Sequence, residues 1–262
     1  MALFVNADDY GKNSSVNKAV CEAFENKYIT STTLMMNMPG VDEAYELAVK
    51  NGYADRVGIH LNITEGIPIT NGIKNNPLIC SPDGSFNAAF YHNTKYRLYM
   101  DRQSIDQIRD EIDAQISRFL EMGFKKLHID SHHHVHTNYP VFCAIKELKV
   151  KYDYDYIRLS RNLYRKGNFL NTVYKFFYNY GVRRLAKESV DYFGSYEDLV
   201  AYLVADNVKV DKYSGDAIKA MEKLVSEKDI EIMVHPFYNK GGILMDTDLP
   251  MQEERYLAIG KD

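Results

Sequence analysis

Five of the eight histidines in this chain lie within nine consecutive residues, His128-Ile129-Asp130-Ser131-His132-His133-His134-Val135-His136. Imidazole rings bind divalent metals and transfer protons near neutral pH, whereas they add little to a hydrophobic core. If the segment is a strand, alternate residues from His128 to His134 face the same side; if it begins a helix, His132 and His136 share a face. Both arrangements predict a polar cluster with metal-ligand character. The alternative is a solvated loop that binds metal only adventitiously.

Two adjacent carboxylates follow the first apolar stretch of the chain, in Asn6-Ala7-Asp8-Asp9-Tyr10-Gly11. Neighbouring side chains of an extended backbone point to different sides, so one carboxylate can bind a metal while the other stays free as a base. Asp-Asp-x-Gly is also an ordinary turn sequence, which is the alternative interpretation of this segment.

Two further histidines accompany apolar stretches. His60 lies in Gly58-Ile59-His60-Leu61-Asn62, and His235 follows Ile232-Met233-Val234 and precedes Pro236. A lone histidine in an apolar strand is more often a hydrogen-bonded core residue than a ligand. Neither residue identifies a site by itself.

Short apolar segments alternate with longer segments of helical periodicity, the pattern of repeated βα units around a parallel sheet. The predicted strands are residues 3–8, 31–37, 56–63, 126–130, 154–159, 190–193, 208–210 and 230–234; the predicted helices are one with Ser14 or Ser15 as its N-cap, and residues 41–51, 104–122, 140–151 and 169–186. Residues 64–103, rich in glycine and proline, are expected to form an irregular insertion that covers or shapes a site. We therefore expect one α/β domain over residues 1–262, a (β/α) TIM-barrel-like fold with seven or eight parallel strands.

The chemically active residues fall at or just beyond the C-terminal ends of different predicted strands. They are Asp8, Asp9, His60, Asp130, His132, Arg158 and His235. This edge of a (β/α) barrel is where active sites form, and one carboxylate with two imidazoles can bind a divalent ion. Arg158 either contacts substrate or forms a structural ion pair. His134 and His136 either orient the metal ligands or contact a substrate.

Composition restricts the class of protein and its partners. With 45% hydrophobic and 26% charged residues the chain is typical of a globular protein, and its net charge of −4 provides no overall attraction to nucleic acid or to an anionic membrane. The three cysteines, Cys21, Cys80 and Cys143, are widely spaced and are expected to be reduced thiols. Because the sequence has no signal-peptide pattern and no run of 18 apolar residues, we expect a cytoplasmic protein without membrane partners.

Four motifs resemble, in order and spacing, the signature segments of the YdjC-like carbohydrate deacetylases, which include chitooligosaccharide deacetylase. They are Asn6 to Gly11, Gly58 to Asn62, His128 to His136, and Val234-His235-Pro236. Tyr10 stands where phenylalanine is usual in the first motif, and Phe237 follows the last motif where glycine is common. The resemblance implies a barrel-like fold of the glycoside hydrolase/deacetylase type. It also implies metal-dependent removal of N-acetyl groups from small amino sugars or chitooligosaccharides.

By motif position, the resemblance makes Asp9, His60 and His132 the metal ligands, Asp8 the general base and His235 the general acid. Asp130, His134, His136 and Arg158 would then bind substrate or support these groups. Family members are often magnesium enzymes and homodimers. The residue types themselves suit zinc, cobalt, nickel, iron or manganese better, because magnesium prefers oxygen ligands.

Two other functions fit parts of the sequence. A metal-dependent phosphoesterase or an amidohydrolase on a non-sugar substrate would use the same Asp/His ligands, with arginines and lysines between Arg158 and Arg184 for a phosphate, although no glycine-rich phosphate loop is present. A non-catalytic protein could use the basic segment from Arg158 to Lys187 to bind an acidic partner. The negative net charge makes nucleic acid an unexpected partner, and the set of Asp8, Asp9, His60, His132 and His235 favours catalysis.

Overall fold

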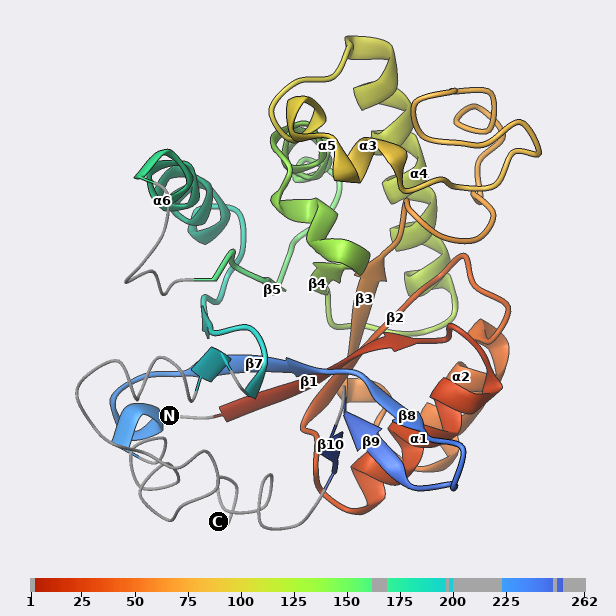
Figure 1. Cartoon of the computed structure of the whole chain (residues 1–262), viewed down its shortest axis with the longest axis vertical. Helices are drawn as coiled ribbons and strands as arrows, with labels where there is room; N and C mark the ends of the chain where they lie inside the picture. The colour runs from red at the N-terminus through yellow and green to blue at the C-terminus, as the bar shows by residue number, and fades with distance from the viewer. Residues whose placement is uncertain (1–2, 162–168, 197, 200–222, 247–248, 252–262) are drawn as a thin grey trace.

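The computed structural model describes residues 3–161, 169–196, 198–199, 223–246 and 249–251. Seven parallel strands form one sheet in the order β5-β4-β3-β2-β1-β7-β6 (Figure 1). Their bounds are β1 Leu3–Tyr10, β2 Ser31–Leu34, β3 Val57–Leu61, β4 His128–Ser131, β5 Tyr156–Ile157, β6 Asp191–Tyr192 and β7 Ile230–Val234. The predicted parallel α/β architecture is confirmed, and seven of the expected seven or eight parallel strands lie within the described residues.

The sheet is curled, so that its two edge strands approach one another. Tyr156 in β5 forms a parallel bridge with Glu188, which lies just before β6. Backbone hydrogen bonds from Lys187 N to Tyr154 O (3.0 Å) and from Glu188 N to Asp155 O (2.9 Å) extend this contact. The curled sheet therefore encloses an interior into which alternate residues of its strands project.

Helices cover the outside of the sheet. Their bounds are α1 Ser14–Glu25, α2 Val41–Lys50, α3 Ala89–His92, α4 Arg102–Glu121, α5 Tyr139–Leu148 and α6 Phe169–Arg183, with 3₁₀ helices η1 Ala54–Arg56, η2 Thr94–Arg97 and η3 His132–Thr137. Figure 1 shows α4 and α5 beside β3 and β4, and α1 with α2 beside β1 and β2. The longest helix among the described residues, α4, buries Ile108, Ile112, Ile116 and Phe119, which lie on one helical face.

The start of α1 differs from the prediction of a serine cap. Asn13, in extended conformation, is the N-cap, and its side chain accepts a hydrogen bond from Val16 N at 3.0 Å. Ser14 is already helical, and its hydroxyl instead donates to Glu43 on α2. Asparagine caps a helix as well as serine does, so residue type alone did not distinguish these neighbours.

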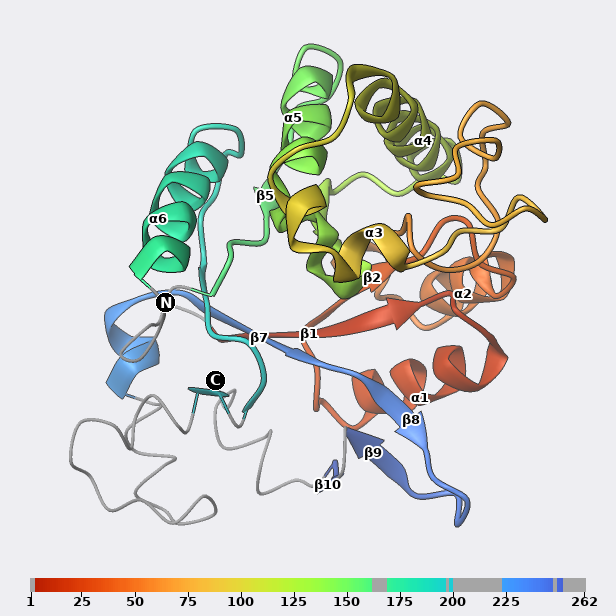
Figure 2. The same ribbon diagram turned by 45° about the horizontal axis from the view of Figure 1, so that its top comes forward.

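Several strands are shorter than predicted, among them β2 Ser31–Leu34, β3 Val57–Leu61 and β5 Tyr156–Ile157. The predicted strand 208–210 lies outside the described residues. The insertion 64–103 is largely irregular, with only α3 and η2. A small antiparallel sheet, β8 Pro236–Tyr238, β9 Leu244–Asp246 and β10 Leu249–Pro250, was not predicted; it lies against α1 (Figure 2).

Cys21, Cys80 and Cys143 are free thiols, as expected. None of the helices in the described part of the chain is both long and apolar enough to cross a membrane. The single-domain organisation over residues 1–262 stays a prediction.

Candidate metal centre and active site

Asp9, His60 and His132 meet at the C-terminal ends of β1, β3 and β4. Asp9 Oδ1 lies 3.2 Å from His60 Nε2 and 2.8 Å from His132 Nδ1. These three donor atoms lie within 4.8 Å of one another, close enough to share one ion. Asp9 and His132 are 123 positions apart in the sequence, with His60 between them, and the parallel sheet brings the three together.

The backbone of β1 explains why the side chains of the adjacent residues Asp8 and Asp9 point in different directions. The β1–β2 register shifts between Ala7 and Tyr10, and Asp9 has a positive φ of 66°. Aspartate tolerates this left-handed conformation better than most residues do. Gly11 continues the turn at φ 84°, where a Cβ would lie 2.6 Å from Leu34 Cδ1. Asp8 therefore points into the buried interior, whereas Asp9 faces His60 and His132.

A buried carboxylate fixes the orientation of the His60 ring. Nδ1 of His60 donates to Asp130 Oδ1 at 2.7 Å, which leaves Nε2 directed at Asp9. Burial lowers the pKa of His60, but the carboxylates of Asp130, Asp9 and Asp8 raise it by more than burial lowers it, so that the pKa is about 10. In the absence of a metal these carboxylates therefore hold a proton on the ring, which a metal ion would have to displace. His132 is supported similarly, because its Nε2 lies 3.1 Å from Glu65 Oε2.

Asp8 forms a buried, two-pronged ion pair with Arg158. Arg158 Nη1 donates to Asp8 Oδ2 at 2.7 Å and Nη2 donates to Oδ1 at 2.8 Å. Burial raises the pKa of Asp8, but the Arg158 guanidinium lowers it more, so that the carboxyl stays ionised. Asn6 Nδ2 adds a hydrogen bond to Asp8 Oδ1 at 2.9 Å.

His235 lies on the same edge, outside the Asp9, His60 and His132 cluster. It directly follows β7, its side chain is exposed, and its backbone N donates to Asp246 Oδ1 at 2.9 Å. Its charge is one of those that lower the pKa of Asp8, which places it within electrostatic reach of that carboxylate. Phe237, the next residue but one, is a partly exposed member of β8.

A model of the YdjC-like protein family matches residues 2–257 of this chain. The chain belongs to the YdjC-like family. It is 38% identical over 154 residues to a carbohydrate deacetylase of Halalkalibacterium halodurans, an alignment that spans 58% of this chain and 62% of the relative. It is 30% identical to a carbohydrate deacetylase of Clostridium beijerinckii over 94% of this chain and 86% of the relative. A third carbohydrate deacetylase, from Thermoanaerobacter pseudethanolicus, is 32% identical over 87% of this chain and 92% of the relative.

Among solved structures, the fold is similar to that of an Enterococcus faecalis V583 protein described as a cellobiose-phosphate cleavage protein. The TM-score is 0.60 at 22% sequence identity, with 98% of this chain and 89% of the other covered. This likeness supports the curled α/β fold of the YdjC-like chain.

A second group of possible ligands in this YdjC-like chain, Asp8, His60 and Asp130, also has donor atoms within 4.8 Å of one another. Its carboxylates are already bound by Arg158, since Nη2 lies 2.8 Å from Asp130 Oδ2 as well as bonding Asp8. Arg158 is fully buried. A cation at this position would meet the guanidinium charge, so the Asp9 group is the better metal site.

Glu231 in β7 is the buried residue that the sequence analysis missed. Arg158 Nε and Nη2 both donate to its Oε1, at 2.8 and 2.7 Å, and the Tyr156 hydroxyl donates to Oε2. Glu231 therefore binds the Nε–Nη2 edge of the guanidinium, next to the Nη1–Nη2 edge that binds Asp8. A single charge in the apolar strand Ile230–Val234 was the available signal.

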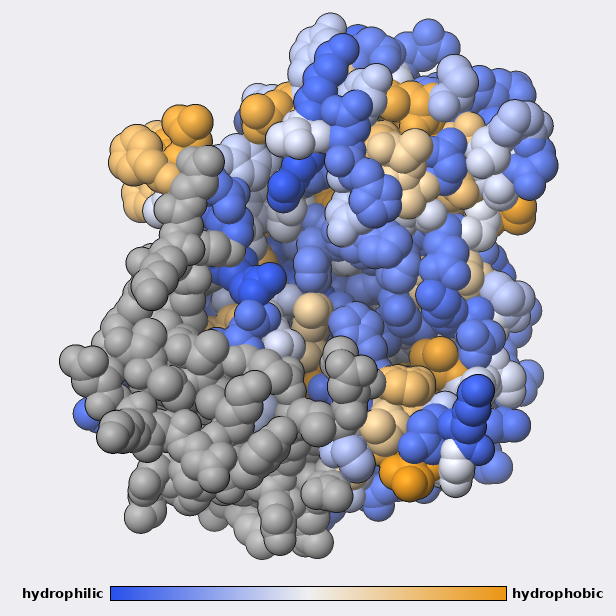
Figure 3. Space-filling view, in the orientation of Figure 1, coloured by the Kyte–Doolittle hydropathy of each residue, from blue (hydrophilic) through white to orange (hydrophobic). Residues whose placement is uncertain are grey.

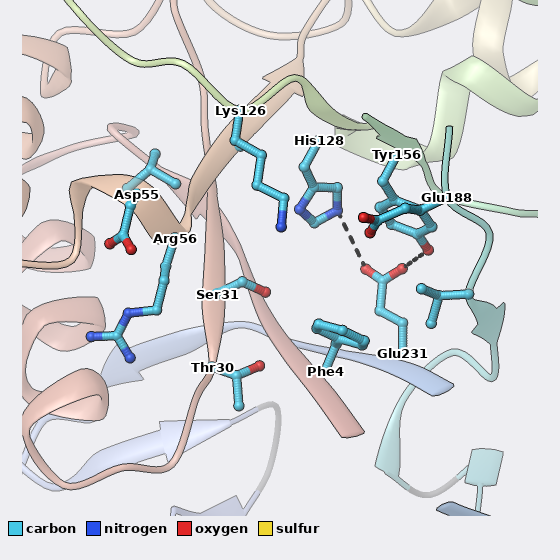
Figure 4. A pocket seen from close by; sticks show the side chains of 13 residues that line it. Phe4, Thr30, Ser31, Asp55, Arg56, Lys126, His128, Tyr156, Glu188 and Glu231 are labelled. Carbon is cyan, nitrogen blue, oxygen red and sulfur yellow. Dashed lines mark hydrogen bonds and ion pairs between the residues drawn. The ribbon is translucent and has the colours of Figure 1, made fainter. Parts of the chain in front are cut away.

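A cavity of about 200 Å³ lies behind this network, at the N-terminal ends of the strands. Figure 4 shows His128 and Tyr156 both directed at Glu231 from the cavity wall. His128 Nε2 is 3.9 Å from Glu231 Oε1, which is too long for a hydrogen bond. Burial and the charges of Arg158 and Lys126 lower the pKa of His128 to about 3, so the ring is neutral and no ion pair forms.

The histidine-rich segment is neither a continuous strand nor a helix with paired His132 and His136. The strand β4 ends at Ser131, and η3 follows with positive φ values of 53° at His133 and His134. His136 is fully buried and its Nδ1 lies 2.5 Å from Ser131 Oγ, away from the Asp9 cluster. His134 faces Tyr192, with ring centroids 6.0 Å apart. The left-handed turn therefore places the side chains of the five histidines in different surroundings.

Tyr10, the departure in the first motif, has a structural explanation. Its hydroxyl donates to Ala44 O at 2.6 Å and lies 3.0 Å from the Tyr53 hydroxyl. The fully buried ring thus fixes the end of β1 against α2 without reaching the site.

Proposed function

We propose that this chain is a metal-dependent carbohydrate deacetylase that removes N-acetyl groups from small amino sugars or chitooligosaccharides. Its membership of the YdjC-like family and the names of its curated relatives support this activity. The observation that carries the proposal is that a candidate metal site and a separate candidate base lie at the same edge of the sheet. Asp9, His60 and His132 can share an ion, while the neighbouring Asp8 is held away from it by Arg158.

A divalent ion fits the group of Asp9, His60 and His132. One carboxylate and two imidazoles suit borderline metals, and Asp130 and Glu65 orient the two rings, as carboxylates do behind metal-bound histidines. When bound there, the ion would polarise the acetamide carbonyl and acidify water. We propose zinc, cobalt, nickel, iron or manganese on the ligand types, and magnesium on the family resemblance.

Asp8 is suited to accept the proton of the attacking water. It is ionised, and Arg158 and Asn6 together bind both of its oxygens and fix its position. The buried ion pair weakens the basicity of Asp8, but it also prevents the carboxylate from swinging onto the ion. Its role is therefore that of a positioned general base.

His235 is suited to protonate the departing amine. It is exposed at the end of β7, where a sugar can reach it, and lies within electrostatic reach of Asp8. An amine leaves poorly unless it is protonated, so a donor on this side of the scissile amide would speed the collapse of the tetrahedral intermediate. Asp130 would act by orienting His60, and Arg158 by holding Asp8 in place. His134, which is partly exposed beside Tyr192, would contact the sugar.

The activity is tested by incubating the purified protein, with each candidate metal added in turn, with N-acetylglucosamine and diacetylchitobiose. Release of acetate, with the matching loss of one acetyl group by mass spectrometry, is the expected result. Release of inorganic phosphate from sugar phosphates without acetate from either substrate would instead establish a phosphoesterase.

We also propose a cytoplasmic homodimer. The three free thiols suit a reducing compartment. The outer face of α6 supports self-association, because it exposes large apolar side chains, which Figure 3 shows gathered at one side of the molecule. They are Phe169, Leu170, Phe176, Phe177 and Tyr180.

A further inference from the structure

Glu231 lies deeper in the curled sheet than the candidate site, and the proposed chemistry does not use it. In β7 it pairs in register with Phe4 of β1, and Asp8 lies four residues further along β1. Alternate residues of neighbouring strands face the same side, so the side chains of Glu231 and Asp8 both point into the interior. The guanidinium of Arg158 lies between the two carboxylates and bonds both.

Glu231 fixes the edge of the guanidinium that Asp8 does not use. Its Oε1 accepts a hydrogen bond from Arg158 Nε at 2.8 Å and lies 2.7 Å from Nη2. The ring of Tyr192 lies against the face of the guanidinium, with 5.0 Å between the ring centroid and Arg158 Cζ. Because a guanidinium is planar and rigid, one held edge and one held face set the direction in which Nη1 and Nη2 point toward Asp8.

Hydrogen bonding rather than packing holds Glu231 in this position. The cavity of about 200 Å³ at the N-terminal ends of the strands borders Glu231, so the carboxylate has room to turn away from Arg158 (Figure 4). The Tyr156 hydroxyl donates to Oε2 and opposes that rotation. His128, the other side chain directed at Glu231, is too distant for a hydrogen bond. The position of Glu231 therefore depends on Tyr156, as the orientation of Arg158 depends on Glu231.

Stability alone does not account for a buried carboxylate at this place. Glu231 is 1% exposed, in a strand whose other residues are apolar. The loss of hydration of a buried ion pair offsets much of its attraction, and apolar side chains of similar volume often stabilise a protein more. What Glu231 adds is a fixed orientation of Arg158.

We propose that Glu231 is a positioning residue for the deacetylation. Held by Tyr156, it orients Arg158, which in turn keeps Asp8 where it can take the proton of the attacking water. The inference rests on the proposed deacetylase function. Because a displacement of about 1 Å at a reacting group can cost about 100-fold in rate, a misplaced guanidinium would be felt in the chemical step. Glu231 bonds Arg158 and Tyr156 rather than the candidate metal ligands, so metal affinity does not depend on it.

Steady-state kinetics of the metal-loaded protein with diacetylchitobiose tests this role. Glu231→Leu removes the hydrogen-bond acceptor and should lower kcat about 10–100-fold, with KM and metal content unchanged. Glu231→Gln keeps an acceptor for Arg158 and should recover most of that loss. Tyr156→Phe should lower kcat in the same direction but by less. The matched control is Glu188→Leu: Glu188 lines the same cavity, is not a partner of Arg158 within the described residues, and should be dispensable for kcat.

A double-mutant cycle shows whether Glu231 acts through Arg158. Arg158→Lys keeps the positive charge but loses the planar fork, so Glu231→Leu should lower kcat little further in that background. Four results would overturn the proposal. They are full additivity of the two changes, an unchanged kcat in Glu231→Leu, an equal fall in Glu188→Leu, and loss of bound metal from Glu231→Leu.

A measurement that needs no turnover separates this inference from the deacetylase proposal. By NMR, the Nε–H proton of Arg158 should exchange slowly with water in the unchanged protein and faster in Glu231→Leu. If Glu231→Leu does not fold, Tyr156→Phe, which removes one hydroxyl, should show the same acceleration. Equal exchange in the unchanged protein and in the folded variant would overturn the positioning role. Absence of acetate release from the unchanged protein would instead contradict the deacetylase function, and the exchange rates would still decide whether Glu231 holds Arg158.

Discussion

Arg158 binds Asp8 through two hydrogen bonds of 2.7 and 2.8 Å, with both side chains buried. The same guanidinium also bonds Glu231 and Asp130, so one cation neutralises much of the charge of three carboxylates. This relationship keeps the candidate base ionised and in place while Asp9, the next residue, stays available to a metal.

Arg158→Ala should lower the free energy of unfolding by about 3–5 kcal/mol, because it leaves buried carboxylates without a counter-charge. Urea denaturation measures the change. Arg102→Ala is the control: Arg102 pairs with two carboxylates, those of Asp106 and Glu147, but it is 63% exposed, so water screens both ion pairs and the expected loss is much smaller. Equal losses in the two variants would contradict the assignment.

Asp8→Asn should abolish acetate release while the metal content per chain is unchanged. The amide keeps the shape of the carboxylate but cannot accept the proton of the attacking water. Asp9→Asn, which makes the same chemical change one residue away, should instead lower metal affinity. Near-normal turnover of Asp8→Asn at saturating metal would show that another group is the base.

His235→Ala should reduce kcat by about 10²–10⁴-fold through loss of the general acid. The side chain is exposed and outside the ligand cluster, so metal content and stability should change little. Steady-state kinetics with acetate detection tests this, and a sugar ester with a good leaving group should be much less affected. A loss of bound metal in this variant would mean that His235 is a ligand.

Asp130→Asn should weaken metal binding by about 10–100-fold, because Asp130 fixes the ring and tautomer of His60. Competition with a fluorescent chelator measures the affinity. Asp113→Asn, a partly exposed carboxylate paired with Lys151 on the protein surface, is the control and should bind metal normally. Unchanged affinity in Asp130→Asn would remove Asp130 from the metal centre.

Stability should fall as pH decreases below about 6.5, because the buried ring of His128 resists protonation. The pKa of His128 is lowered to about 3 by burial and by Arg158, so between these pH values the unfolded chain binds a proton that the folded chain does not. One such group costs up to ~1.4 kcal/mol per pH unit in that window. His128→Gln should therefore flatten the dependence of unfolding free energy on pH between about 7 and 5, relative to the exposed control His92→Gln. An unchanged slope would mean that His128 is charged in the folded protein.

The outer face of α6 should hold two copies together. Phe176→Glu with Phe177→Glu should convert a dimer to a monomer in light scattering, because charge at a dehydrated apolar contact is strongly unfavourable. A monomeric parent protein, or a dimer unaffected by both changes, would contradict the proposal.

The sequence predicted the convergence of Asp8, Asp9, His60 and His132 because the ends of parallel strands meet at one edge of a sheet, and this depends only on strand order and direction. The assignment of Asp9 as a metal ligand is what the resemblance implies, whereas the separation of its side chain from that of Asp8 depends on a left-handed backbone that the sequence does not specify. The same holds for His133 and His134, whose two positive φ angles turn the chain just beyond the end of β4.

Other features required packing information. Arg158 was identified as a strand-end residue, but its three carboxylate partners lie on β1, β4 and β7, and only the curled sheet brings these strands around it. Glu231 sits in an otherwise apolar strand, and its part as a partner of Arg158 is evident only from their contact in the fold. The β8–β10 sheet is made of two- and three-residue strands, too short for a hydrophobic alternation to be recognised.

Anomalous diffraction from crystals soaked with zinc or cobalt tests the central claim most directly. A metal peak about 2.0–2.2 Å from an oxygen of Asp9, from Nε2 of His60 and from Nδ1 of His132, with Asp8 uncoordinated, is the expected result. No peak at saturating metal, or a peak bound by Asp8 with Asp130 and without Asp9, would contradict it.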